Sequence, residues 1–508
     1  MSCSVSTSAS RGTSGHAPPP NQPPATRTIE VGADIIETNS FGSTPLVLAE
    51  YGIADRAYEL SFQAAAIARR AAAAASTPEW PRFVAGAVGP TTKLVSLGHI
   101  SFAELLESFA VQIHGLIAGG ADIIQIETGQ DILGIKCAVL AARLGMERAG
   151  REVPIITQVT METTGTMLVG TEIAAALPAL EALDVDVIGL NCATGPDLMH
   201  EHVRYLGQNA SRFVSVLPNA GLPRNVNGVA TYDLTPESLA DFQERFIRDY
   251  GVSLVGGCCG TTPEHIAAVR KRLQSGAAAA RPRPDYDRAP GQVTSLYVPV
   301  LLTQDPGPLI IGERSNANGS KKFREQLLRE DFEGLVEVGR EQVAEGAHLI
   351  DVCVAYVGRD EVRDMREVLR RYTTQITLPL MIDTTQLDVL ESALQQLGGR
   401  AVINSVNLED GEEKADKKDR KGRRSEDKDG SKDGAKKGGK ATISISVRPF
   451  AIVYVDNKKI GQTPVRDYAL SSGSHTILLV NDAKGKREKI TVKASSGEKL
   501  APINKDWN

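Results

Sequence analysis

The sequence predicts an α/β protein: a (β/α)8 barrel of the TIM type, then a truncated second (β/α) barrel and a small all-β C-terminal module. Residues 30–274 alternate short apolar runs with amphipathic or alanine-rich stretches of helical length, which indicates repeated βα units around a parallel sheet. The same alternation resumes after residue 298. From residue 441 onward, polar and apolar residues alternate with period two, as in half-buried strands.

The composition bounds the class of protein and its partners. A length of 508 residues allows about three domains, and 42% hydrophobic with 23% charged residues is ordinary for a globular chain. The net charge of -5 gives no reason to expect nucleic-acid or membrane partners. The alanine-rich stretch 64–75 contains two arginines and is too short to cross a bilayer, so it predicts a surface helix.

Residues 1–29 are predicted to be a disordered tail. They are rich in Ser, Thr, Pro and Ala and lack the apolar core of a secretory signal. Arginines without acidic residues give them a weak likeness to a transit peptide. The composition favours the tail, and we expect a cytoplasmic protein.

Seven buried strands are expected in the first domain, residues 30–275. They are residues 33–37, 83–88, 122–127, 155–159, 185–190, 213–217 and 253–255. A barrel of this type has eight strands, and no segment before residue 33 has the pattern of a strand. The sequence therefore predicts a TIM-type barrel that lacks its first strand.

Three cysteines follow two of these strands, at the end of the barrel where such enzymes carry their chemistry. Cys192 follows the fifth strand, and Cys258 and Cys259 follow the seventh. Adjacent side chains of a strand point to opposite faces, so the pair can share one metal only where the backbone leaves the strand. Glycines around the pair allow that turn. Three thiolates and one open position predict a catalytic zinc site.

Two other readings of these cysteines exist. Cys258 and Cys259 could form a strained vicinal disulfide, or the three could be small buried apolar residues. The remaining cysteines, Cys3, Cys137 and Cys353, have the surroundings of inert thiols. Free thiols indicate a reducing compartment.

The second half of the chain divides at two linkers. An Ala-, Pro- and Arg-rich linker covers residues 276–298, and a second βα domain covers 299–413 with only four expected strands, 309–312, 348–353, 379–382 and 401–405. Residues 414–440 are highly charged without large apolar residues, which predicts a flexible linker rather than a nucleic-acid-binding segment. Strands expected at 441–447, 451–455, 475–480 and 488–492 form a β module over 441–508, without a catalytic cluster.

Several motifs of the first domain resemble the homocysteine S-methyltransferase domain of cobalamin-dependent methionine synthases. They are residues 189–196 (GLNCATGP), 255–265 (VGGCCGTTPEH), 33–42 (ADIIETNSFG), 83–90 (FVAGAVGP) and 126–128 (IET). Residues 310–316 (IIGERSN), 319–324 (GSKKFR), 381–385 (MIDTT) and 403–412 (INSVNLEDGE) resemble the next domain of that family, which binds methyltetrahydrofolate. The two resemblances occur in the family's order.

The resemblance implies a zinc-dependent methyltransferase that makes methionine. Zinc on Cys192, Cys258 and Cys259 would bind homocysteine sulfur at the open position. Asn219 resembles the family's displaceable oxygen ligand. Glu127 resembles the carboxylate that holds the homocysteine amino group, although it could instead be a buried helix cap.

In the second domain the resemblance assigns a pterin site. It places Glu313 in the cofactor site, and it assigns Asp351, Asp383 and Asn404, at successive strand ends, to hydrogen bonds with the pterin ring. These residues could instead cap helices. The methyl donor would be methyltetrahydrofolate or a corrinoid; cobalamin would have to come from another domain or a corrinoid protein in trans.

The sequence also departs from the family. The usual first strand with its Asp-Gly-Ala-Met-Gly-Thr turn is missing, Cys353 stands where asparagine is usual, and the last four βα units of the second domain are missing. The C-terminal module resembles a PEGA-type domain through residues 453–456 and 461–464, with Phe450 in place of a usual glycine. These departures predict weak methyl transfer. The alternative is a catalytically impaired composite whose β module serves binding or attachment.

Overall fold

The computed structural model describes residues 2–5, 24–227, 229–274, 291–404 and most of 441–507. Three hydrophobic cores lie in three separate segments of the chain, one for each region of regular structure. Contacts divide the chain into two compact units, residues 1–420 and 421–508, which are described separately below. The segment 414–440, predicted to be a flexible linker, lies outside the described residues.

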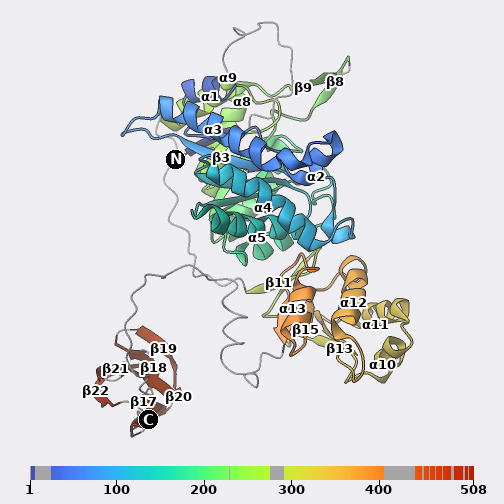
Figure 1. Cartoon of the computed structure of the whole chain (residues 1–508), viewed down its shortest axis with the longest axis vertical. Helices are drawn as coiled ribbons and strands as arrows, with labels where there is room; N and C mark the ends of the chain where they lie inside the picture. The colour runs from blue at the N-terminus through green and yellow to red at the C-terminus, as the bar shows by residue number, and fades with distance from the viewer. Residues whose placement is uncertain are drawn as a thin grey trace. The chain divides into compact units, whose positions relative to one another are not determined.

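Eight parallel strands in the described part of the chain close a barrel (Figure 1). They are β1 (Ser2–Val5), β2 (Ile35–Glu37), β3 (Phe83–Val88), β4 (Ile123–Gly129), β5 (Ile155–Val159), β6 (Val187–Asn191), β7 (Phe213–Leu217) and β10 (Leu254–Gly257). β5 and β6 are buried at every residue, as expected for a parallel sheet covered by helices, and this explains their unbroken apolar runs. The prediction of a TIM-type α/β barrel is confirmed.

A helix follows each barrel strand. The helices are α1 (Pro24–Glu30), α2 (Pro45–Leu48), α3 (Ala57–Ala75), α4 (Phe102–Ala118), α5 (Ile132–Ala149), α6 (Ile173–Glu181), α7 (Pro196–Asn209), α8 (Pro236–Tyr250) and α9 (Pro263–Gln274), with short 3₁₀ turns at Ala49–Tyr51, Ala54–Arg56 and Val95–Leu97. Capping residues determine where several helices begin. Ser101 and Glu104 form a capping box at the N-terminus of α4, and Asp131 caps the N-terminus of α5. The alanine-rich α3 buries one face, including Ala65, Ala68 and Ala72.

The prediction that the barrel lacks its first strand is wrong. Ser2–Val5 form β1, which pairs in parallel with β10 on one side and β2 on the other. Pro24–Glu30 form α1, so the expectation of a disordered tail over residues 1–29 is also wrong at these two segments. The run Ser-Cys-Ser-Val has no hydrophobic periodicity. It is a strand because the backbone N–H and C=O groups of β10 and β2 would otherwise lack partners.

The second domain is an open sheet of four parallel strands within the described residues. Its order is β13 (Ile311–Asn316), β14 (Leu349–Cys353), β15 (Leu380–Asp383) and β16 (Val402–Asn404), connected by α10 (Lys321–Leu328), α11 (Phe332–Ala344), α12 (Glu361–Gln375) and α13 (Leu387–Leu394). A short antiparallel hairpin, β11 (Gln292–Thr294) with β12 (Pro299–Leu301), precedes it. The four expected strands are confirmed, although β13 extends further than predicted.

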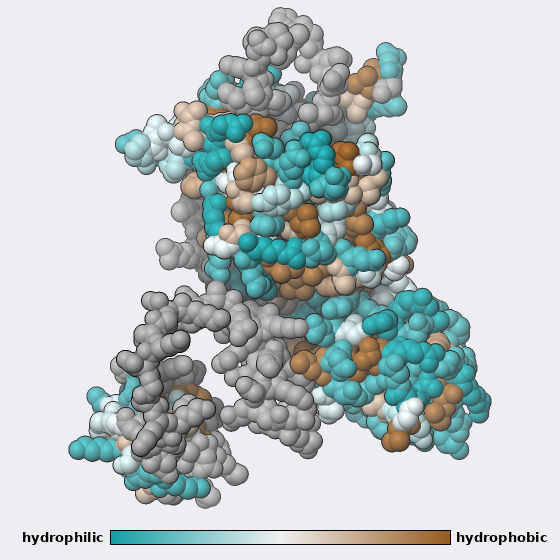
Figure 2. Space-filling model, viewed as in Figure 1, coloured by the Kyte–Doolittle hydropathy of each residue, from teal (hydrophilic) through white to brown (hydrophobic). Residues whose placement is uncertain are grey.

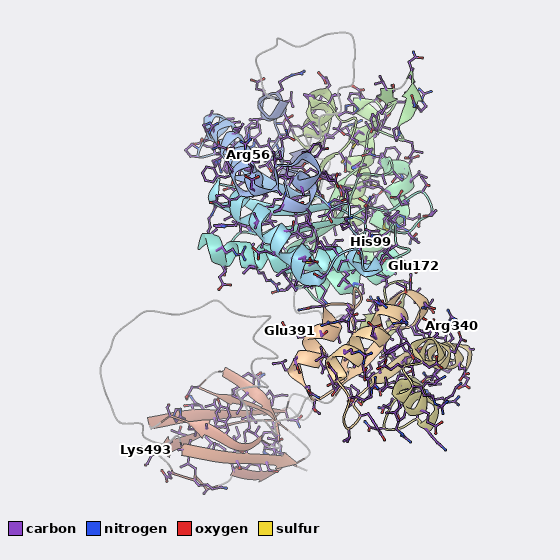
Figure 3. All side chains as sticks on the ribbon, turned by 45° about the vertical axis from the view of Figure 1, so that its right-hand side comes forward. Arg56, His99, Glu172, Arg340, Glu391 and Lys493 are labelled. Carbon is purple, nitrogen blue, oxygen red and sulfur yellow. The ribbon has the colours of Figure 1, made fainter. Side chains whose placement is uncertain are left out.

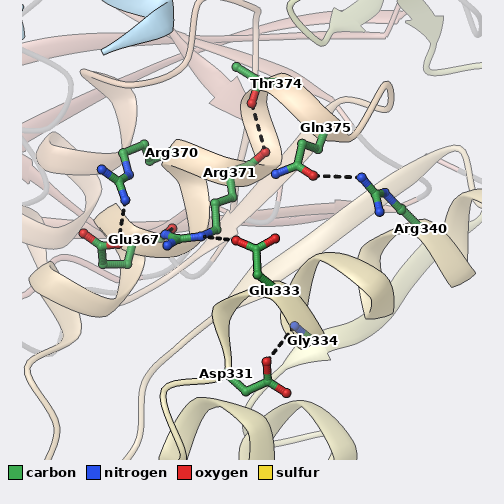
Figure 4. Close-up of polar contacts among 9 residues, drawn as sticks. All are labelled: Asp331, Glu333, Gly334, Arg340, Glu367, Arg370, Arg371, Thr374 and Gln375. Carbon is green, nitrogen blue, oxygen red and sulfur yellow. Dashed lines mark hydrogen bonds and ion pairs between the residues drawn. The ribbon is translucent and has the colours of Figure 1, made fainter. Parts of the chain in front are cut away.

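Ion pairs connect the helices on the surface of this domain. Arg371 on α12 binds Glu367 one turn earlier and reaches Glu333 on α11, while Arg340 on α11 binds the amide oxygen of Gln375 (Figure 4). Hydrophilic residues predominate over this helical face (Figure 2). The Arg340 side chain is about half exposed and projects outward (Figure 3), so the ion pair that it also forms with Glu337 contributes little to stability.

The C-terminal module consists of two small sheets within its described residues. β20 (Val465–Leu470), β17 (Ala441–Arg448) and β23 (Ile503–Asp506) form one sheet. β19 (Lys458–Gln462), β18 (Ile452–Val455), β21 (Gly473–Asn481) and β22 (Lys486–Ala494) form the other. Ile443, Ile445, Val453 and Leu479 alternate with more exposed residues and build a core that includes Trp507. The period-two pattern thus predicted strands correctly, but β19, β20 and β23 were not predicted.

No helix among the described residues has the length and apolar character needed to cross a bilayer.

The closure of the barrel by β1 can be tested with a proline at Cys3, whose partner in the ladder is Val255. Proline removes a backbone N–H from a strand paired on both sides. We expect Cys3→Pro to lower the thermal unfolding midpoint of the barrel by more than about 4 °C, because a loss of 1 kcal/mol shifts a domain of this size by about 2–4 °C. Cys3→Val, which keeps the N–H, is the control. Equal midpoints for the two variants would show that β1 is not part of the barrel in solution.

A second prediction concerns the β module, where the imidazole of His475 lies between Asp456 and the backbone of Ser471. Nδ1 lies 2.5 Å from Oδ2 of Asp456, and Nε2 donates to the Ser471 carbonyl oxygen at 2.8 Å. These hydrogen bonds raise the pKa of His475, and the bond to Asp456 has the larger effect. A raised pKa stabilises the folded state below the unfolded-state pKa of about 6.5, and the contribution is lost as the pH rises through the folded-state value.

We therefore expect the urea concentration at the unfolding midpoint of the module to decrease as the pH is raised from 6 to 9. The only tryptophans are Trp80, in the barrel, and Trp507, so a Trp80→Phe chain reports the module alone through Trp507 fluorescence. His475→Asn in that background should flatten the pH dependence. A midpoint that stays constant in the His475 parent would contradict the prediction.

Candidate active site

Three sulfurs converge at the carboxyl ends of β6 and β10. Sγ of Cys259 lies 3.9 Å from Sγ of Cys192 and 4.0 Å from Sγ of Cys258, and all three lie within 4.8 Å of one another. Zinc–sulfur bonds of about 2.3 Å in a tetrahedral site place two sulfurs about 3.8 Å apart. The spacing of the three thiols therefore fits one zinc ion. The predicted cluster of Cys192, Cys258 and Cys259 is present, and the described cysteines, these three included, are free thiols rather than disulfides.

The backbone leaves its strands where the cysteines occur. β10 ends at Gly257, so Cys258 and Cys259 lie in the turn beyond it, and Gly260 has a φ of +78°. Cys192 and Ala193 have φ values of +60° and +57°, in the left-handed region that few residues other than glycine adopt. Such strain persists only where the surroundings impose it, and it is typical of functional sites.

The segment after β7 connects the two cysteine loops by hydrogen bonds. Cys258 N donates to the carbonyl oxygen of Pro218 at 2.8 Å, and Ala220 N donates to that of Cys259 at 2.9 Å. The side chain of Asn219 joins this set, because its Oδ1 accepts from Cys259 N at 3.1 Å. The oxygen that the resemblance assigns to metal therefore holds the backbone of Cys259, and it would have to turn to become a ligand.

Asn191 is a functional candidate that the sequence did not identify. It is fully buried at the end of β6, and its Nδ2 lies 3.2 Å from Oε2 of Glu127, 3.0 Å from Oγ1 of Thr128 and 3.9 Å from Sγ of Cys258. Its Oδ1 accepts from Thr128 N at 2.7 Å. Asn191 thus connects the carboxylate to the sulfur cluster. Its position directly before Cys192 is the only signal in the sequence.

Glu127 is a buried carboxyl group beside the cluster. Burial raises the pKa of Glu127 well above its usual value, and the negative charges of Glu37 and Cys259 add to this shift. Glu37, also buried, accepts from Nε2 of Gln125 at 2.5 Å. The next helix, α5, is capped by Asp131, so the structure gives Glu127 no part in that cap. A buried carboxyl of this kind suits a cationic group of a ligand, which would favour its ionised form.

The electrostatics of the thiols also suit a cation. Hydrogen bonding with Cys192 and Cys259, followed by burial, raises the pKa of Cys258 well above the ordinary value. Three crowded thiols therefore resist ionising together unless a cation compensates their charge. Cys258 is buried, whereas Cys192 and Cys259 are only partly covered, so one side of the cluster is open to a ligand.

A second polar cluster lies at the carboxyl ends of β13 to β16. Asn316 Nδ2 donates to Oδ2 of Asp351 at 3.0 Å and to Oδ2 of Asp383 at 3.3 Å, and Asn404 hydrogen-bonds to Asp351. Asp351 is 3% exposed, and among the described residues its Oδ1 is buried without a hydrogen-bond partner. Burial raises the pKa of Asp351, although the Asn316 amide opposes the shift. An acceptor left unpaired in this way suits the N–H groups of a ligand.

The other predicted residues of this cluster differ in position. Glu313 is exposed on β13, close enough for its charge to act on Asp351. Helices α10 and α12 are capped by Ser320 and Asp360, so Asp351 and Asp383 do not serve these two caps. Asn316 was not predicted as a site residue, although it ends the run IIGERSN. Cys353 is buried beside Asn318, and burial raises the pKa of its thiol to about 11.

The fold and the thiol cluster define a (β/α)8 barrel with a metal-type site at the carboxyl ends of its strands. Residues 26–273 match the model of the homocysteine S-methyltransferase family, and residues 312–420 match that of pterin binding enzymes. These matches confirm the two family resemblances at the level of the domains.

Two curated relatives match most of the chain. The chain is 50% identical over 384 residues to the methionine synthase of Mycobacterium tuberculosis and 48% identical over 389 residues to that of Mycobacterium leprae. Each match covers 76% of this chain but only 32% of the relative, so the chain spans about a third of their length. Among solved structures, the metallated homocysteine methyltransferase MmuM of Escherichia coli aligns at 24% identity, over 49% of this chain and 83% of that chain, with a TM-score of 0.40.

The zinc assignment predicts about one zinc per purified chain, and Cys258→Ala should lose most of it. Three thiolates are the minimum set here, and two seldom retain zinc against buffer. Elemental analysis after desalting measures the loss. Cys137→Ala, which removes a buried thiol on α5 away from the cluster, is the matched control and should keep its zinc. Full retention of metal by Cys258→Ala would contradict the site.

Proposed function

We propose that the chain is a zinc-dependent homocysteine S-methyltransferase of the methionine synthase type. The observation that carries the proposal is the convergence of Cys192, Cys258 and Cys259 at zinc-like spacing, in a domain that matches the homocysteine S-methyltransferase family. Zinc bound there would lower the pKa of the homocysteine thiol and supply a thiolate near neutral pH. The reduced cysteines suit the cytoplasm.

The protein residues hold and orient the substrate in this proposal. Glu127, buried beside the cluster with its Oε2 bound by Asn191, would receive the homocysteine ammonium group, whose positive charge would favour the ionised carboxylate. Asn219 fixes the backbone of Cys259, and Asn191 fixes the carboxylate relative to Cys258. Holding reactants in such a geometry can supply about 7–11 kcal/mol of a barrier. A sulfur–carbon bond to the methyl group then forms, and the bond to the donor breaks with its electron pair left on the donor.

The methyl donor is proposed to be a corrinoid presented by another domain or protein. Methyltetrahydrofolate would bind at the second sheet, where Asp351, Asp383, Asn404 and Asn316 converge and Asp351 Oδ1 is unpaired among the described residues. That sheet has four strands in its described part, so its pterin site is less enclosed than a complete barrel would provide. Folate use should therefore be the weaker activity.

The β module is proposed to be a PEGA-type extension for binding or attachment. In support, its two sheets surround a hydrophobic core of their own, and it forms a contact unit apart from residues 1–420. Charged side chains such as Lys493 project from β22 into solvent (Figure 3).

Activity tests the proposed reaction. The zinc-loaded chain, mixed with homocysteine and methylcobalamin, should form methionine slowly, and Cys259→Ala should reduce the rate at least 100-fold because it removes one of three ligands. Replacement of methylcobalamin by methyltetrahydrofolate should give less product. Methionine formation equal in wild type and Cys259→Ala would refute the proposal.

A further inference from the structure

Tyr232 lies against the cysteine turn, although it is 27 residues away in the sequence. It directly follows the hairpin of β8 (Arg224–Val226) and β9 (Val229–Thr231), which projects from the barrel at the upper right of Figure 1. A Cβ atom built on Gly260 would lie 2.3 Å from Cγ of Tyr232. The ring therefore packs on the bare backbone of Gly260, one residue beyond Cys259, in a space that exists because Gly260 has no side chain.

The loop that carries Tyr232 is anchored on both sides of the ring. Ala220 N donates to the Cys259 carbonyl oxygen, and Leu234 N donates to the Ala220 carbonyl oxygen at 3.0 Å. The carbonyl oxygen of Leu234 lies 2.8 Å from Nε2 of His265, whose Nδ1 lies 2.9 Å from Oγ1 of Thr262. Because Leu234 is fixed in this way, Tyr232, two residues earlier, is held over the sulfur cluster.

The hydroxyl group of Tyr232 hydrogen-bonds to Cys259 and interacts electrostatically with all three cysteines. A phenol has its proton near neutral pH, so the Tyr232 hydroxyl group can act as the donor of this hydrogen bond. Cys258 has a similar donor, because Nδ2 of Asn191 lies 3.9 Å from its Sγ. Each cysteine of the adjacent pair thus faces a neutral donor.

Charge explains why such donors are useful. Three thiolates and one divalent cation leave a net charge of about -1 in a partly buried site. Hydrogen bonds to the sulfurs disperse this charge, and groups that contact metal ligands typically change metal affinity by 10- to 100-fold.

We propose that Tyr232 is a positioning residue of the metal centre, which donates a hydrogen bond to Sγ of Cys259 and covers that side of the three sulfurs with its ring. This inference rests on the proposed zinc site. It adds a second side chain from the β7–α8 loop, after Asn219, to a centre whose sulfurs come from the ends of β6 and β10.

The test is the rate at which zinc is lost to an excess of a coloured chelator. Tyr232→Phe keeps the ring and removes only the hydroxyl group, so we expect zinc release about 10-fold faster than from wild type. Tyr232→Ala, which also removes the cover, should release zinc faster still. Tyr250→Phe is the matched control: it removes a phenol that bonds to His200 on α7, and it should release zinc at the wild-type rate within twofold.

Cobalt provides a second readout that a purely structural role would not change. In Co²⁺-loaded protein, loss of the hydrogen bond to Cys259 should shift the thiolate-to-cobalt charge-transfer band of Tyr232→Phe but not that of Tyr250→Phe. Wild type without stoichiometric Zn²⁺ or Co²⁺ would overturn the metal site itself. Normal loading with the same release rate and spectrum in Tyr232→Phe would overturn only the role of Tyr232.

Discussion

The site depends on one constraint, the convergence of three sulfurs from two strand ends. A regular strand would direct Cys258 and Cys259 to opposite faces, so the turn after Gly257 is a requirement of the cluster. Cys192 meets the pair because its backbone adopts a left-handed conformation, with a φ of +60°. The hydrogen bonds of Pro218, Asn219 and Ala220 to the cysteine turn hold this geometry, which an unsupported loop would relax.

The barrel provides the frame that keeps these strand ends in register. The cysteine pair directly follows β10, which pairs with β7 on one side and with β1 on the other. Backbone hydrogen bonds therefore hold β10 on both sides next to the site. An open edge there would leave β10 with unpaired N–H and C=O groups and greater freedom. The four-stranded second sheet shows the contrast, because its described edge strands β13 and β16 include exposed residues, Glu313 and Ile403 among them.

The sequence predicted what depends on local pattern. The cysteine trio, seven barrel strands and the four strands of the second sheet follow from apolar runs and glycines. β1 was missed because Ser-Cys-Ser-Val has no periodicity, and its structure depends on neighbours more than 30 and 250 residues away. Asn191 and Tyr232 were missed for a related reason: contact with Glu127 in one case and Gly260 in the other gives them their roles. Such contacts leave little local signal; for Asn191 it is only the position directly before Cys192.

X-ray absorption at the zinc edge tests the central claim most directly. The account predicts three sulfur neighbours at about 2.3 Å and one lighter neighbour in the zinc-loaded chain. Homocysteine should replace the lighter atom and raise the count to four sulfurs, because the open position is the substrate position. Two or fewer sulfurs, or a spectrum that homocysteine leaves unchanged, would contradict the account.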